Sequence, residues 1–180
     1  MKRLALVLLL AACSQTTAPN RTAVFEANAD QVTIGMRMKM TEEGTTKADL
    51  HADTAVTPPG SSRTNLTGVR LVFSTPSGKD GKLTSKKGEY DPTSQVMVAR
   101  GGVVLIVPGE AGKGTRTITS EELHWDQRGD RVWSEKKTTM VEEGRTLHTQ
   151  GFTSDTRFQN ISGKSASTGS VQVGDGGIRF

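Results

Sequence analysis

A short pattern that recurs along the chain constrains its fold more than any other feature. In the segments 83–91, 118–126 and 147–155, an aliphatic residue and two polar residues precede an aspartate that stands eight positions after the aliphatic one. The second segment begins 35 residues after the first, and the third begins 29 residues after the second. We interpret each unit as two strands joined by a turn that begins at the aspartate. Repeats of this length predict a single stacked domain, in which each unit buries its apolar face against its neighbours.

Alternation of apolar and polar residues indicates that the elements of this stack are strands. From Val32 to Met40 every second residue is apolar, and Leu71 and Phe73 follow the same rule, whereas 103–107 is apolar throughout. Alternation predicts strands with one buried face, and a continuous apolar run predicts a strand covered on both faces. Because only 33% of the residues are hydrophobic and 4% are aromatic, a wide layered sheet fits better than a compact helical fold. We therefore predict an all-β protein.

The N-terminus has the features of an export signal. The basic residues Lys2 and Arg3 precede the apolar run 4–10, which is too short to span a bilayer as a helix, and Cys13 follows two alanines. We predict a signal peptide over 1–12, a lipidated Cys13, a tether over 13–23 and one domain over 24–180. The alternative is an ordinary signal peptide with a cysteine by chance. As the only cysteine of the chain, Cys13 allows no intrachain disulfide.

No group of residues predicts catalysis. His51, His124 and His148 lack the spacing of metal ligands, and the chain has no nucleophile-elbow motif. We expect no enzyme activity, no metal, no cofactor and no nucleic-acid partner. An unrecognised hydrolase site is a weaker option, and Ser120 with His124 is its best candidate.

The succession of these segments resembles the LptC family of lipopolysaccharide-export proteins and the wider OstA/LptA-like group. The likeness runs from about 29 to 164, and its matching segments are 49–55, 66–71, 81–104, 120–134 and 151–155. The resemblance implies an open, twisted β-jellyroll, in which two antiparallel sheets enclose an apolar slot that shields acyl chains. It also implies that edge strands pair with related jellyrolls, so that successive slots form a bridge.

By the same resemblance, the chain accepts lipopolysaccharide from an inner-membrane ABC transporter with LptF/LptG-type subunits and passes it to an LptA-like protein. One departure affects the localisation. Many family members have an N-terminal transmembrane helix, whereas this chain has Cys13 in a lipobox-like sequence, which predicts a lipid anchor on the periplasmic side of the envelope. The family implies the inner membrane, but Ser14 leaves the outer membrane open. The rival interpretation is a scaffolding lipoprotein with a filled interior and no lipid cargo.

The residues expected to line the slot are those on the apolar face of the alternating strands. Three methionines on one strand suit a groove for flexible chains, although methionine is also a common core residue. Trp125 and Trp133 follow the repeat, and we expect them to pack within the stack. The predicted slot residues are Val32, Ile34, Met36, Met38, Met40, Leu71, Phe73, Val103, Leu105 and Met140.

Overall fold

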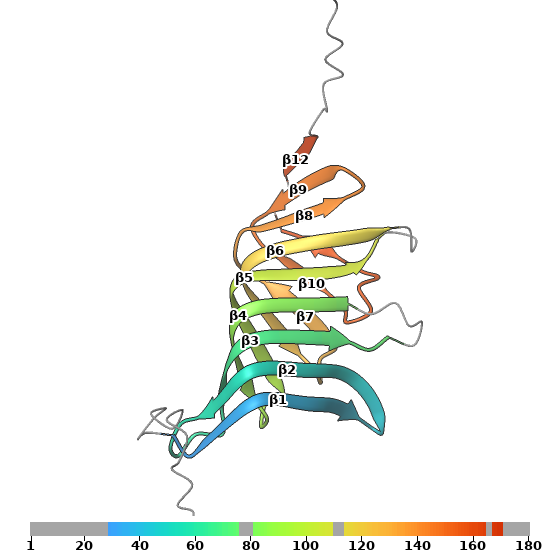
Figure 1. Cartoon of the computed structure of the whole chain (residues 1–180). Coiled ribbons are helices and arrows are strands. Elements are labelled where there is room, and N and C mark those ends of the chain that lie inside the picture. Colours follow the sequence, from blue (N-terminus) through green and yellow to red (C-terminus); the bar gives the residue numbers. More distant parts are fainter. Residues whose placement is uncertain (1–28, 76–80, 110–113, 165–166, 171–180) are drawn as a thin grey trace, which may run out of the picture.

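The regular structure of the chain is β-strand throughout the part that the computed structural model describes, residues 29–75, 81–109, 114–164 and 167–170 (Figure 1). The all-β prediction is confirmed. The predicted signal peptide and the tether that begins at Cys13 lie outside the described residues. The strands are β1 (Gln31–Glu42), β2 (Thr45–Thr57), β3 (Thr64–Phe73), β4 (Gly81–Asp91), β5 (Val96–Pro108), β6 (Thr115–Asp126), β7 (Arg131–Ser134), β8 (Thr138–Glu142), β9 (Arg145–Thr149), β10 (Phe152–Ser154), β11 (Ser162–Gly163) and β12 (Ser167–Ser170).

The strands form an antiparallel meander that divides at β6. From β1 to β6 each strand pairs with the next one in the chain. Residues 116–120 of β6 then pair with β8, and residues 124–126 pair with β7. β8 continues the sheet through β9 to β12, and β7 continues it through β10 to β11. One sheet therefore becomes two layers.

Strands β1 to β6 bend and contribute to both layers (Figure 1). The front layer contains β8, β9 and β12 with the segments in register with them: 36–42, 45–52, 69–73, 81–85, 103–108 and 115–120. The back layer contains β7, β10 and β11 with the segments 31–34, 54–57, 64–67, 87–91, 96–100 and 122–126. In Figure 1, β7 and β10 lie behind the long strands of the front layer.

Glycines mark the line along which the sheet bends. Gly35 has φ +64° and Gly68 has φ +65°, a conformation that glycine adopts without steric cost. Gly101 and Gly102, with φ +79° and +62°, lie where the register of β5 shifts. At Gly68 a Cβ would come within 1.9 Å of an Asp53 carboxylate oxygen, so a side chain there meets an unfavourable backbone angle and also has to displace the Asp53 carboxylate. We call this row of positions the bend line.

The bend line changes which residues of a strand face inward. Within one layer the inward residues are two positions apart, as in any strand. On β2 and β6 consecutive inward residues across the bend line are three positions apart, as for Ala52 and Ala55 and for Ser120 and Leu123, all of which are buried. On β5, where the register shifts, the inward residues Ala99 and Val103 are four positions apart. Where the step is three residues, a pattern of strict alternation inverts its faces at the bend line.

The positions that recur in the sequence repeat lie at the bend line and in the turns. Ser85 and Thr149, the third residues of their units, are buried and donate hydrogen bonds to the carbonyl oxygens of Lys87 (2.8 Å) and Thr138 (3.5 Å). The equivalent Ser120 shares a 3.0 Å hydrogen bond with Ser134. These hydroxyl groups satisfy polar groups where the bend interrupts the sheet ladder.

The repeated aspartates begin turns, as predicted. Asp91, Asp126 and Asp155 each accept a hydrogen bond from a backbone N–H two to four residues later, at 2.9 Å, 3.0 Å and 3.0 Å. These aspartate turns join β4 to β5, β6 to β7 and β10 to β11. Each repeat unit is thus a strand, a turn and a returning strand.

Candidate functional site

The inner face of the front layer carries one aliphatic side chain from each of eight neighbouring strands. In cross-strand order they are Met38, Leu50, Leu71, Leu83, Leu105, Ile118, Met140 and Leu147, which we call the aliphatic row. The six central members are 0–6% exposed, whereas Met38 and Leu147 at the two ends are half-buried. Because strands lie about 4.8 Å apart, the row is roughly 34 Å long. It crosses the layer from the β1 edge to β9.

Eight of the ten predicted slot residues lie on this inner face. Those that are buried are Met40, Leu71, Phe73, Val103, Leu105 and Met140. Met36 and Met38 are half-buried and pack against the same core. The structure therefore brings the eight residues together, and their contact with lipid stays a prediction.

The prediction was wrong for Val32 and Ile34. They are 38% and 71% exposed and lie on the outer face of β1. Thr33, between them, pairs with the buried Ala55 and therefore faces inward. The error has a physical cause: the bend at Gly35 inverts the faces, so the alternation that places Met36 inward places Ile34 outward.

The inner face of the back layer contains residues that the slot prediction missed. Its buried side chains are Ala55, Leu66, Met97, Ala99, Leu123, Trp125, Val132 and Phe152. Trp125 packs edge-to-face on Phe73 of the front layer, with ring centroids 5.2 Å apart, so the expectation that it packs within the stack is confirmed. Trp133 instead lies on the outer face, where it stacks on His124.

The interior between the layers is filled in this conformation. The central residues of the aliphatic row and Trp125 are at most 6% exposed. At the end of the layers away from the bend line, which we call the open end, Phe158 also contacts Phe73, at 5.2 Å between centroids. These side chains therefore contact one another here, and an open slot that accepts a lipid stays a prediction.

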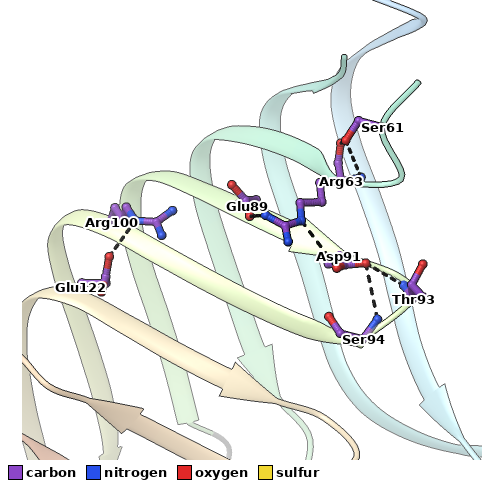
Figure 2. A network of polar contacts seen from close by, with 8 residues as sticks. All are labelled: Ser61, Arg63, Glu89, Asp91, Thr93, Ser94, Arg100 and Glu122. Atoms are coloured by element: carbon purple, nitrogen blue, oxygen red, sulfur yellow. Dashed lines mark hydrogen bonds and ion pairs between the residues drawn. The ribbon is translucent and has the colours of Figure 1, made fainter. Parts of the chain in front are cut away.

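Charged and aromatic groups lie in a ladder on the outer face of the back layer. Arg100 Nε donates to Glu122 at 2.7 Å, and His124 Nε2 lies 3.0 Å from the other Glu122 oxygen (Figure 2 shows the first pair). His124 stacks on Trp133, and Arg131 lies 4.7 Å from the centre of the same indole. Partial burial alone would raise the pKa of Glu122, but hydrogen bonds from Arg100 and His124 lower it below the usual value.

A second polar group lies at the open end of the back layer. Arg63 forms ion pairs with Glu89 at 3.4 Å and with Asp91 at 3.6 Å (Figure 2). The backbone N–H of Thr93 donates to Asp91 and lowers the pKa of that carboxyl, against a smaller opposing effect of burial. These contacts are exposed and fix a turn, so they are structural.

The structure does not assemble the hydrolase candidate. Ser120 faces inward and bonds to Ser134, whereas His124 faces outward and bonds to Glu122. The bend line between them places the two side chains on opposite faces. Within the described ranges, no three His, Cys, Asp or Glu side chains are grouped as metal ligands.

Among the described residues, no helix has the length and apolar character needed to cross a membrane.

Comparisons with known proteins agree with this geometry. Residues 3–170 match the family model of LptC-related lipopolysaccharide-assembly proteins. Among solved structures, the fold is similar to that of LptH from Pseudomonas aeruginosa, described as the LptA-homologous periplasmic component of the lipopolysaccharide transport device. That match has a TM-score of 0.51 and 16% identity, and covers 64% of this chain and 80% of LptH. No curated protein sequence matches the chain.

The family match covers most of the chain, and the likeness to LptH shows the same open antiparallel β-fold. The chain therefore belongs to the LptC-related family of lipopolysaccharide-assembly proteins, so its role lies in lipopolysaccharide transport in the periplasmic envelope and not in catalysis.

Proposed function

We propose that this chain accepts lipopolysaccharide from an inner-membrane ABC transporter with LptF/LptG-type subunits and passes it to an LptA-like protein. The observation that carries the proposal is the aliphatic row, which runs across the front layer from the β1 edge to β9. A track in this direction suits acyl chains that enter at one edge and leave at the other. The sugar head group then stays in water outside the layers.

The free energy gained by burying acyl chains and the cost of opening the interior together favour reversible binding of lipid. Each methylene that moves from water to an apolar surface contributes about 0.8 kcal/mol, so several acyl chains give a large driving force. Because the central row is at most 6% exposed, the lipid has to displace side chains or separate the layers. That cost offsets part of the driving force and allows the lipid to leave again, with the transporter supplying the work.

The edges of the sheet are suited to partners of the same fold. Within the described ranges, β1 pairs only with β2 over its twelve residues, and β11 and β12 end the two layers on the other side. Edge strands accept further strands by backbone hydrogen bonding. Since Met38 lies on β1, strand addition at that edge extends the aliphatic row into the partner, whereas at the other edge β12 separates Leu147 from an added strand.

The proposal also includes the membrane anchor. A diacylglyceryl group on Cys13, followed by the tether 13–23, holds the domain at a membrane without a spanning helix. An anchor in the inner membrane puts the domain beside the transporter, and an outer-membrane anchor is the alternative. Fractionation of the two membranes distinguishes them, and Cys13→Ser is expected to release the domain from either.

Lipid retained through purification tests the function. Wild-type protein is expected to carry lipopolysaccharide that mass spectrometry detects, and Met38→Asp is expected to lose most of it because a carboxylate enters the exposed end of the aliphatic row. Ile34→Asp is the matched control, since it makes the same kind of change on the outer face of the same strand. Equal lipid in the two variants would contradict the proposal.

The second candidate function is a scaffold without cargo, and the filled interior favours it. A scaffold uses its edge strands to hold partners and has no need of the row. It predicts no lipid in the wild-type preparation and normal partner pull-down by Met38→Asp. These results together would replace the carrier proposal.

A further inference from the structure

One side chain from a turn closes the open end of the interior. Phe158 lies between β10 and β11, is 5% exposed, and contacts the ring of Phe73. A Cβ on Gly81 would lie 2.3 Å from the Phe158 ring, so this ring fills the space beside the first residue of β4. Phe158 has φ +57°, which is uncommon for a residue with a bulky side chain. The turn therefore directs the ring into the interior against the local backbone preference.

Hydrogen bonds from neighbouring residues hold this turn. The Phe158 N–H donates to the Asp155 carbonyl oxygen at 3.2 Å, and the Thr156 hydroxyl donates to Asp130 in the turn before β7. Asp155 accepts hydrogen bonds from the N–H of Gln159 at 3.0 Å and from the Asn160 side chain at 2.9 Å. The flanking strands β10 and β11 share only two residue pairs. Segments with so little pairing open locally at low cost while the rest of the fold persists.

A second contact crosses the open end. Gln127, in the turn after β6, is 5% exposed, and its Nε2 donates to the carbonyl oxygen of Thr41 at 3.2 Å. The contact joins the back layer to the end of β1 in the front layer. A single neutral hydrogen bond is a modest restraint.

A polar group beside Phe73 lacks a partner. Trp125 is 2% exposed, and its indole N–H is the buried side-chain donor without a hydrogen bond in the described part of the chain. A buried donor without an acceptor is unfavourable. Trp125 and Phe158 contact the same Phe73 ring, so the unpaired donor and the ring that closes the open end belong to one cluster.

We propose that Phe158 is a displaceable plug that occupies the place of a lipid acyl chain, and that Trp125 binds the chain that replaces it. When the plug leaves, the space beside Phe73 and Gly81 accepts hydrocarbon. The indole N–H of Trp125 then donates to the ester or amide carbonyl oxygen at the head of an acyl chain. The inference rests on the proposed lipid-carrying function and adds where the chain enters and which residue recognises it.

Photo-crosslinking with purified lipopolysaccharide tests the plug. A diazirine side chain at position 38 reports lipid on the aliphatic row, away from the open end. Phe158→Ala removes the plug, and Gly81→Ala displaces it without removing the ring; both are expected to raise the crosslinking rate several-fold. Phe152→Ala is the control, because it removes a buried ring of the back layer next to the bend line and is expected to leave the rate unchanged.

The outcomes separate the plug from the function. Lipid crosslinking in the wild type that neither Phe158→Ala nor Gly81→Ala increases would overturn the plug and leave the carrier function intact. An equal increase in Phe152→Ala would show general loosening and would also overturn it. No crosslinking in any variant would reject the carrier function and the plug together.

Nuclear magnetic resonance of the two indole N–H groups tests Trp125. On addition of lipopolysaccharide, the Trp125 proton is expected to move downfield as it gains an acceptor, whereas the Trp133 proton on the outer face stays in place. A Trp125 signal that does not move while position 38 crosslinks to lipid would overturn the role of this residue.

Discussion

The two layers share strands β1 to β6, yet their inner faces differ. The front layer presents an unbroken row of Leu, Met and Ile from β1 to β9. The back layer mixes small residues such as Ala55 and Ala99 with the rings of Trp125 and Phe152. The outer faces differ too, since the exposed Ile106 and Val141 lie on the front layer, whereas the back layer carries the ladder from Arg100 to Arg131.

Under the proposed function, this difference separates two tasks within one sheet. A uniform aliphatic surface contacts hydrocarbon without selecting one position along it, as a transport track requires. Trp125 of the back layer and Phe158 of the turn after β10 close the interior at the open end, where both contact Phe73. We infer that the front layer is the track and that the back layer is its cover.

The largest effects are expected from two buried leucines, one in each layer. Their variants distinguish a loss of stability from a loss of lipid contact. Leu105→Ala in the front layer and Leu123→Ala in the back layer each remove a fully buried side chain, so each is expected to lower the free energy of unfolding by about 2–5 kcal/mol. Only Leu105→Ala is expected to reduce lipid retention beyond its effect on stability. Urea unfolding and mass spectrometry of retained lipid measure the two effects. Equal lipid loss in both variants would remove the distinction between track and cover.

The next largest effect is expected on fold stability, from substitutions at the bend line that creates the two layers. Gly68→Ala meets both an unfavourable φ and the Asp53 carboxylate, whereas Gly102→Ala meets only the unfavourable φ in open space. Gly102→Ala is expected to destabilise the fold by about 1 kcal/mol, and Gly68→Ala by more. Thermal unfolding of both variants checks the order, and the reverse order would show that the contact with Asp53 does not constrain the bend.

The smallest effect concerns the outer face of the back layer. Because the folded-state pKa of Glu122 is lowered, this carboxylate stabilises the fold above the usual glutamate pKa, and the stabilisation is lost as the pH falls through the lower folded value. Glu122→Gln is therefore expected to reduce the loss of stability on acidification. Unfolding curves between about pH 3 and pH 7 measure it, and parallel wild-type and variant profiles would contradict it.

Much of the fold could be predicted because its rules are local. Alternation identified the strands around Met38 and Leu71, the apolar run 103–107 identified the strand around Leu105, and the repeated aspartates identified the turns. The prediction that 103–107 is covered on both faces was wrong, since Ile106 is 41% exposed. The buried and exposed faces of β1 before Gly35 could not be predicted. An alternating sequence pattern does not show that the backbone angle at Gly35 reverses which residues face inward. A glycine inside an alternating strand was the available signal, and it would have reassigned Val32 and Ile34.

The site was harder to predict than the fold. Phe158 follows Arg157 in a polar turn outside any alternating pattern, and only the three-dimensional arrangement brings it to Phe73. Trp125 and Trp133 share the rhythm of the repeat but lie on opposite faces. The close packing of the interior depends on how the two layers contact each other. Neither the composition nor the spacing of residues in the sequence predicts that contact.

Crosslinking along one strand tests the central claim most directly. Diazirine side chains placed one at a time at positions 103 to 107 of β5, in cells that export lipopolysaccharide, sample the inner face at 103, 105 and 107 and the outer face at 104 and 106. We expect lipopolysaccharide adducts at the three inner positions and few at the two outer ones. Adducts confined to the outer positions, or none at any position, would contradict it.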